Sequence, residues 1–380
     1  MGFILTEEQQ MLRDVVGRYV ADRFPIAHRR KAQNPEGAFD RAAWQGMADE
    51  LGILGASFDE DIGGLGGGGM EMLILMEEFG RGLALQPFLH TVVAAGGILK
   101  RWDSPLAAEL ISAIVAGHAI LTIAHAEPQS RYIPWNVEAR ARGEGDSYRL
   151  DGHKAVVADA PWADWFIVSA RTAGGPLDKD GISLFLVPRD AQGLSRRDYR
   201  LIDGGCASEL LLEDVLVSAD NRISDGSGYD ILMPALDEAT AAVCGEACGI
   251  LRQMLELTID HLRNRVQFGK PLSAFQVLRH RIVDMAVQVE LACAASRQAA
   301  TLLDDPAARS KAVSAAKIQV GEACRFVGEN AVQLHGAMGV TDEAPISLYF
   351  RRALVIERSF GSSDYHLDRY HALLQAEARR

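Results

Sequence analysis

Apolar residues recur at helical spacing in the first and last thirds of the chain. Near the N-terminus, Thr6 and Gln9 form a capping-box pattern, and the apolar residues after them share one helix face. The same spacing predicts helices near 41–51, 70–83 and 92–110. It also predicts four longer helices over about 231–262, 274–303, 307–335 and 343–375.

The pattern changes between about residues 119 and 217. Short runs rich in Val, Ile and Leu are separated by turn sequences such as Asp151-Gly152 and Asp180-Gly181. The runs predict strands at 120–125, 148–157, 165–171, 182–188 and 209–217. We therefore expect a mainly α protein with three domains: an N-terminal helical domain (1–117), a middle antiparallel β-barrel or sandwich (118–225) and a C-terminal four-helix bundle (226–380).

Composition narrows the class of protein. The net charge of −12 argues against a nucleic-acid partner, because phosphate binding needs clustered Lys and Arg. The first ten residues lack the basic start of a signal peptide. No apolar run reaches the roughly 18 residues of a membrane span. The five cysteines are scattered, as expected for reduced thiols, so the sequence predicts a cytoplasmic protein.

Two segments could suggest ion binding, and neither pattern favours it. The glycine-rich stretch Asp59–Gly69 lacks the Gly-Lys-Ser/Thr ending of a phosphate loop, so we expect a flexible loop. Asp364, His366, Asp368 and His371 have a spacing that scatters side chains around a helix, whereas a metal needs converging ligands. No metal site is expected.

The turn between the first two long C-terminal helices has the sequence RNRVQFGKPLSAFQ (263–276). Pro271 must end any helix there, and spacing alone is compatible with an ordinary bundle loop. The pattern Arg-x-x-Phe-Gly-x-Pro-Leu-x-x-Phe-Gln, however, resembles the signature of the acyl-CoA dehydrogenase family, and the resemblance extends over essentially the whole chain. It implies FAD-dependent α,β-dehydrogenation of an acyl-CoA thioester, a tetramer, and electron-transferring flavoprotein as electron acceptor.

The resemblance also implies residues that reach into a neighbouring protomer's FAD. In the family, this turn and a later Gln-x-x-Gly-Gly-x-Gly segment hold the pyrophosphate and adenosine. Arginine suits a pyrophosphate because its planar fork donates two hydrogen bonds. By resemblance, the cofactor-binding residues are Arg265, Phe268, Gly269, Gln276, Gln333, Gly336 and Gly339.

The residues that would contact the flavin ring of the chain's own site depart from the family pattern. The family's Thr-Glu-Pro-x-Ala-Gly-Ser-Asp segment is Ala126-Glu-Pro-Gln-Ser-Arg-Tyr132 here, and Arg131 and Tyr132 would crowd a flavin. The family's ring-stacking Trp is replaced by Val156. The hydroxyl beside flavin N5 is replaced by Ala158.

The catalytic base is absent from both usual positions. Phe360 occupies the position of the common C-terminal Glu, and Ala239 occupies the alternative position on the first helix of the bundle. Three nearby acids, Asp364, Glu238 and Glu246, are weak candidates for a replacement base, and a solvated or capping carboxylate is the simpler role for each.

The residues that would reach a neighbouring subunit's FAD keep the family pattern, whereas the flavin-ring and base positions of the chain's own active site do not. The simplest hypothesis is a non-catalytic partner that completes the FAD site of a catalytic sister subunit. Segments such as AHAEPQSRY, RFVGENAVQLHG and FGSSDYHL resemble the small-subunit family of pimeloyl-CoA dehydrogenase. Two alternatives remain: a self-sufficient homotetramer with an unusual base, which would bind FAD alone, and a non-enzymatic acyl-CoA-binding or scaffold homologue.

Overall fold

A computed structural model describes residues 5–26, 39–224 and 226–379. It divides the chain into two compact units. Unit 1 takes its described residues from 1–31, 68–84 and 240–380, and unit 2 takes them from 32–67 and 85–239. The division into domains 1–117, 118–225 and 226–380 stays a prediction.

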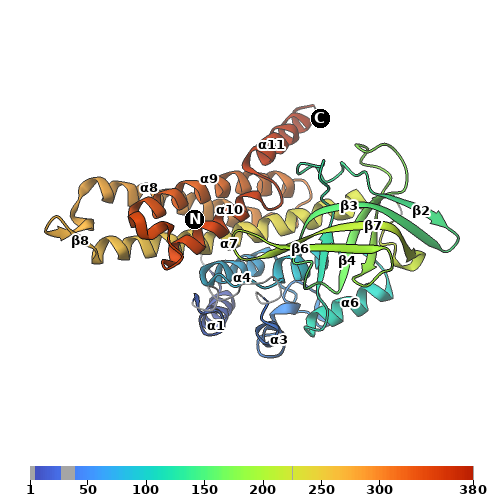
Figure 1. The fold of residues 1–380 in the computed structure, drawn as a ribbon, viewed down its shortest axis with the longest axis horizontal. Coiled ribbons are helices and arrows are strands. Elements are labelled where there is room, and N and C mark those ends of the chain that lie inside the picture. Colours follow the sequence, from blue (N-terminus) through green and yellow to red (C-terminus); the bar gives the residue numbers. More distant parts are fainter. Residues whose placement is uncertain (1–4, 27–38, 225, 380) are drawn as a thin grey trace. The chain divides into compact units, whose positions relative to one another are not determined.

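Unit 1 is helical (Figure 1). The predicted capping box of its first helix is present: Thr6 Oγ1 accepts from the Gln9 N–H, and the Gln9 side chain accepts from the Thr6 N–H. The elements of the unit are α1 (Glu7–Arg23), α4 (Gly69–Gly82), α7 (Gly228–Asn264) from Thr240 on, α8 (Gln276–Thr301), α9 (Arg309–His335), η7 (Gly336–Val340), α10 (Pro345–Arg358) and α11 (Ser363–Ala378).

Helices α4 and α7 of unit 1 cross with their backbones close together. A Cβ at Gly80 would lie 2.0 Å from the Glu246 carbonyl oxygen, and a Cβ at Gly249 would lie 1.9 Å from the Glu77 carbonyl oxygen. Only glycine fits at either position, because real Cβ atoms do not approach so closely. The contact fixes the register between the two helices.

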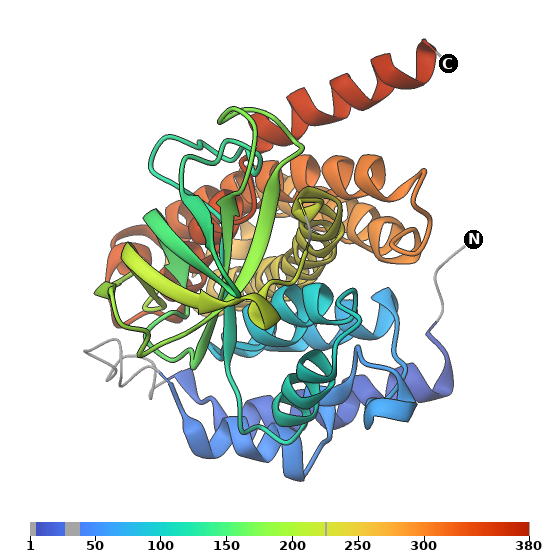
Figure 2. The ribbon, with the colours of Figure 1, turned by 90° about the vertical axis from the view of Figure 1, so that its right-hand side faces the viewer.

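The predicted last helix, 343–375, is wrong in one respect. The chain breaks at 359–362 into α10 and α11, with Phe360 at φ 56° and Gly361 at φ 118°. Both values lie outside the helical region, and Ser362 caps α11 by accepting from the Tyr365 N–H. The apolar spacing continues across the break, so periodicity alone could not reveal it. α11 projects beyond the other helices of the unit (Figures 1 and 2).

Unit 2 contains a seven-stranded twisted sheet (Figure 2). Its path runs β1-β4-β2-β3-β7-β6, and β5 pairs with β4. The ladders are antiparallel, as predicted, except β1–β4 and β2–β4, which are parallel. The strands are β1 (Leu121–Ala124), β2 (Arg140–Glu144), β3 (Ser147–Ala158), β4 (Trp165–Arg171), β5 (Ile182–Pro188), β6 (Leu194–Arg200) and β7 (Cys206–Ser218).

Two of these strands, β2 and β6, were not predicted. Their sequences, RARGE and LSRRDYR, are polar, and most of their side chains are exposed. Backbone pairing to β3, β4 and β7 holds them in the sheet, together with polar side-chain contacts such as Arg142–Asp151 and Tyr199–Glu209. Apolar runs identify strands that bury a face, and these two strands bury little.

The helical part of unit 2 also differs from its prediction. It contains α3 (Arg41–Asp49), the π-helix η4 (Leu89–Ala95), α5 (Gly96–Leu99) and α6 (Pro105–Val115). The expected helix over 92–110 is interrupted before Pro105, where Ser104 caps α6. In the glycine-rich segment, Leu65 and Gly67 donate to the Gly55 and Ala56 carbonyls. Within the described ranges, no helix is both long and apolar enough to cross a membrane.

Candidate functional site

The turn that carries the family-like signature forms a small hairpin beyond α7 and α8 (Figure 1). Strands β8 (Val266–Gln267) and β9 (Lys270–Pro271) pair across Phe268 and Gly269, whose φ values of 53° and 76° are left-handed. Arg265 precedes the hairpin and is exposed, and Phe268 is 88% exposed. Gln276 begins α8. Exposed arginine and aromatic side chains in such a tip are available to a second molecule.

The second part of the predicted cofactor site ends α9. Gln333 is exposed, and α9 stops at Gly336, where φ is 63°. A Cβ at Gly339 would lie 2.5 Å from the Val332 carbonyl oxygen, so the turn requires glycine. Replacing the family's middle glycine with Ala337 leaves these two glycine positions intact.

A pair of histidines joins the two parts of this predicted site. The rings of His261 in α7 and His335 in α9 are stacked, with centroids 4.4 Å apart and planes at 27°. His261 lies one helical turn before Arg265, whose N–H donates to the His261 carbonyl, and His335 lies between Gln333 and Gly336. Sequence analysis missed both histidines, because nothing in their spacing predicts that two helices end side by side.

The turn between α10 and α11 offers no carboxylate at position 360. Lys317 is fully buried and donates to the carbonyls of Glu357 (2.9 Å) and Gly361 (2.7 Å). His366 Nε2 donates to the Phe360 carbonyl at 3.1 Å, and Ser314 Oγ lies 3.3 Å from its Nδ1. Two buried side chains therefore hold three carbonyls of the turn, those of Glu357, Phe360 and Gly361, and Phe360 is fixed in its left-handed conformation.

His366 makes this turn sensitive to acid. Burial, with Lys317 and Arg369 nearby, lowers the pKa of His366 to about 3 from 6.5. Between pH 6.5 and pH 4 the unfolded chain binds a proton at this position that the folded chain does not, so stability should fall by about 3 kcal/mol as the pH is lowered. Urea unfolding at both pH values measures this loss. His366→Gln should remove most of it, and His371→Gln on exposed α11 should leave it unchanged.

The three replacement-base candidates differ in their surroundings. Glu246 is only 4% exposed and accepts both hydrogen bonds of a bidentate pair with Arg352, at 2.6 and 2.7 Å. Glu238, in unit 2, accepts from Arg101 at 2.6 Å. Asp364 is exposed in the first turn of α11, where a carboxylate complements the helix N-terminus. Ala239 is completely buried. These surroundings give each acid a structural role.

In unit 2, the positions expected beside a flavin ring have unusual backbone. Val156 lies at a bulge in β3 with φ 51° and is 58% exposed. Arg131 and Tyr132 have φ values of 43° and 73°. A β-branched residue in the left-handed region is strained by about 1–3 kcal/mol. Ala158 follows two residues later, and its carbonyl accepts from Thr122 Oγ1 at 2.8 Å.

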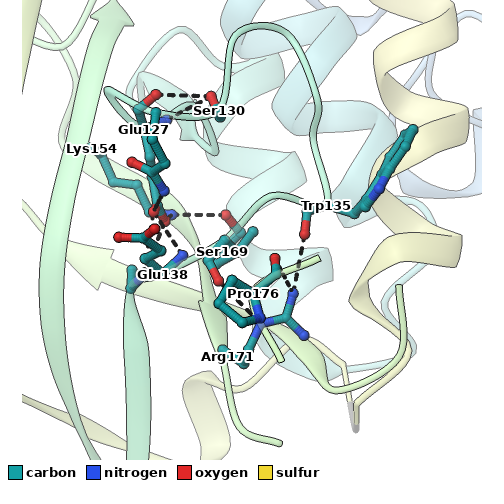
Figure 3. A network of polar contacts seen from close by, with 11 residues as sticks. Glu127, Ser130, Trp135, Glu138, Lys154, Ser169, Arg171 and Pro176 are labelled. Carbon is teal, nitrogen blue, oxygen red and sulfur yellow. Dashed lines mark hydrogen bonds and ion pairs between the residues drawn. The ribbon is translucent and has the colours of Figure 1, made fainter. Parts of the chain in front are cut away.

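A buried ion pair lies next to this bulge (Figure 3). Lys154 Nζ is completely buried and lies 2.5 Å from Glu127 Oε1 and 3.1 Å from Ser169 Oγ. Glu127 also accepts from the N–H groups of Glu138 and Ala139. Glu127 belongs to the Glu-Pro of segment 126–132, and no spacing in the sequence links it to Lys154. Glu127, which precedes the segment 128–137, therefore binds the backbone that follows it, and Lys154 holds the Glu127 carboxylate in place.

Another contact of unit 2 that the sequence did not predict joins His90 and Asp159. His90 Nδ1 lies 2.6 Å from Asp159 Oδ2, which ties the π-helix to the end of β3. Across the described part of the chain, no group of three or more His, Cys, Asp or Glu residues is arranged to hold a metal ion.

The helical elements on either side of a curled β-sheet along the chain match the element order of a known class of flavin-dependent dehydrogenases. Family models for the N-terminal, middle and C-terminal domains of acyl-CoA dehydrogenase match residues 6–118, 122–215 and 226–374. The chain is 31% identical over 369 residues to the human mitochondrial short-chain specific acyl-CoA dehydrogenase, covering 95% of this chain and 88% of that protein. It belongs to the acyl-CoA dehydrogenase family of FAD-dependent oxidoreductases.

Solved structures agree with this assignment. The ChsE4–ChsE5 complex from Mycobacterium tuberculosis contains a chain 30% identical to this one, with a TM-score of 0.89 and 99% coverage of both chains. The Tcur3481–Tcur3483 steroid ACAD variant contains one that is 29% identical, with a TM-score of 0.87 and 98% and 99% coverage. The predicted family, fold class and FAD dependence are confirmed. The narrower match to a pimeloyl-CoA dehydrogenase small subunit stays a prediction.

Proposed function

We propose that this chain is the partner subunit of a heteromeric acyl-CoA dehydrogenase and completes the FAD site of a catalytic sister subunit. One observation carries the proposal: the turn at 357–361 presents Phe360, held by Lys317 and His366, where the family presents its base. The exposed Arg265 hairpin, by contrast, keeps the signature intact.

The two halves of an FAD site fit the chain unequally. Arg265, Gln333 and the turn at Gly336 suit the diphosphate half, because the arginine is exposed and Gly336 has open space where a side chain would stand, which allows close approach to the backbone. Val156 and Ala158 offer neither the aromatic ring nor the hydroxyl that the family places at the flavin ring. FAD accepts a hydride when it is bound. This chain would contact the diphosphate of an FAD that is bound in the sister subunit.

The proposed substrate of such a complex is a bulky, ring-bearing or dicarboxylyl acyl-CoA. Two similar structures are named as a two-component complex and a steroid ACAD. The small-subunit resemblance to pimeloyl-CoA dehydrogenase points to a dicarboxylyl thioester. Electron-transferring flavoprotein is the proposed acceptor, since similar proteins include the caffeyl-CoA reductase–Etf subunit CarC of Acetobacterium woodii. A cytoplasmic location and a tetramer belong to the same proposal.

Flavin content tests the proposal. The chain is purified alone and after co-expression with a neighbouring acyl-CoA dehydrogenase subunit encoded beside it. We expect a colourless lone chain and a yellow complex with stoichiometric FAD. Stoichiometric FAD on the lone chain, bleached by an acyl-CoA, would instead establish a self-sufficient enzyme and direct attention to Asp364, Glu238 and Glu246. No flavin in either preparation would indicate a scaffold.

A further inference from the structure

The stacked histidines lie between the two segments that the proposed function assigns to a diphosphate. His261 is four residues before Arg265, and His335 is two residues after Gln333 and one before Gly336. Their ring centroids are 4.4 Å apart, so a ligand that contacts one imidazole at this end of the helices can also reach the other. Both residues are half-buried and therefore accessible from one side.

The hydrogen-bond pattern shows which nitrogen of His335 faces away from its helix. Its Nδ1 lies 2.8 Å from the Ala331 carbonyl, which can only accept, so Nδ1 carries a hydrogen. Nε2 is then the nitrogen that can gain a proton and donate to an anion. Both rings lie at helix C-termini, where the helix dipole favours a cation.

Neighbouring groups leave this site short of negative charge. Burial lowers the pKa of both imidazoles, and His335 and Arg265 lower the pKa of His261 further. Asp260 and Arg263 flank His261 along α7 with opposite charges, and η7, which follows His335, has the sequence GAMGV without a titratable side chain. An anion placed here would supply the counter-charge that a protonated imidazole needs.

We infer that His261 and His335 form, with Arg265, a diphosphate-binding subsite that binds its ligand more tightly when one imidazole is protonated. The inference rests on the proposed function for the identity of the ligand, the diphosphate diester of a sister subunit's FAD. To the proposed function it adds His261 and His335 as diphosphate-binding residues and a dependence of FAD affinity on pH. Loss of FAD on alkalinisation would then be a property of this chain and not of the catalytic subunit.

ADP-ribose tests the subsite on the lone chain, because its diphosphate diester carries the same charge at pH 5.5 and 7.5. Calorimetry should show binding about tenfold tighter at pH 5.5, the effect of a pKa rise of one unit on binding. His261→Phe/His335→Phe keeps stacked rings without titratable nitrogens and should reduce the ratio to about one. His371→Phe, on exposed α11, should leave the ratio unchanged, and circular dichroism checks that each variant folds.

Several results would overturn the inference. Binding that is absent at both pH values, or that does not change with pH, excludes the protonated subsite. A pH ratio that survives in the double phenylalanine variant excludes the two histidines as its source. These outcomes are separate from failure of the proposed function, which would appear as FAD on the lone chain or a flavin-free complex at pH 7.5.

Discussion

Arg265→Ala should lower the affinity of the two-subunit complex for FAD by about 10- to 100-fold. A guanidinium that donates to a phosphate contributes about 1.5–3 kcal/mol, and its loss corresponds to this range of dissociation constants. The side chain is exposed at the start of the β8–β9 hairpin, so its removal should not disturb the fold of this chain. FAD released during gel filtration and fluorescence titration of the apo-complex measure the effect.

Arg263→Ala is the matched control for that experiment. Arg263 lies two residues earlier in the last turn of α7 and is also exposed, but it is not part of the family-like signature. The control should retain FAD as the unaltered complex does. Equal losses in both variants would show that a general positive field, and not Arg265 itself, holds the cofactor, and the assignment of this hairpin to the FAD site would have to be abandoned.

Lys154→Met should destabilise the chain by about 3–5 kcal/mol. The substitution removes the cation from the buried pair and leaves the Glu127 carboxylate without its counter-charge, and breaking a buried ion pair from one side has a cost of this size. Lys154 is completely buried, so water cannot replace its ammonium. Unfolding in urea, followed by the circular dichroism of the sheet, measures the change.

The partner substitution distinguishes a charge effect from a packing effect. Glu127→Gln alone should also destabilise the chain, because it leaves Lys154 charged and unpaired. The double variant Lys154→Met/Glu127→Gln should be more stable than either single variant, since no uncompensated charge remains. A double-mutant cycle gives the coupling directly. Additive losses would mean that the pair contributes only packing. Lys100→Met, at an exposed part of unit 2, should cost less than 1 kcal/mol.

The sequence predicted the elements that bury apolar faces and the segments that resemble a family signature. The long helices of unit 1 and strands β3, β4, β5 and β7 follow from apolar spacing. The cofactor role of Arg265 and Gln333 was predicted from the family-like motifs and stays a prediction. Periodicity failed where polar strands are held by backbone pairing and polar side-chain contacts, as in β2 and β6. It also failed at Phe360, where the break depends on a backbone angle that the apolar pattern does not encode.

The residues that sequence analysis missed share a physical cause. His261 and His335, Glu127 and Lys154, and His90 and Asp159 are each brought together by tertiary structure over 27 to 74 residues of chain. Their residue types carry no local signature, and a single histidine in a helix usually packs or caps. Only the positions of helix ends and strand registers show that such pairs meet. The assignment of the weak base candidates likewise depended on partners such as Arg352, which the sequence does not link to Glu246.

Arg171 holds the 172–181 loop in a way that constrains how this part of the chain can change over generations. Its guanidinium donates to the backbone carbonyls of six residues in two loops, namely Trp135, Val137, Ala173, Pro176, Asp178 and Asp180 (Figure 3). Every amino acid supplies a carbonyl, so the six accepting residues can change their side chains and still accept from Arg171. The arginine cannot be exchanged, because no other side chain donates in so many directions. Substitutions are therefore expected at the accepting positions and not at Arg171.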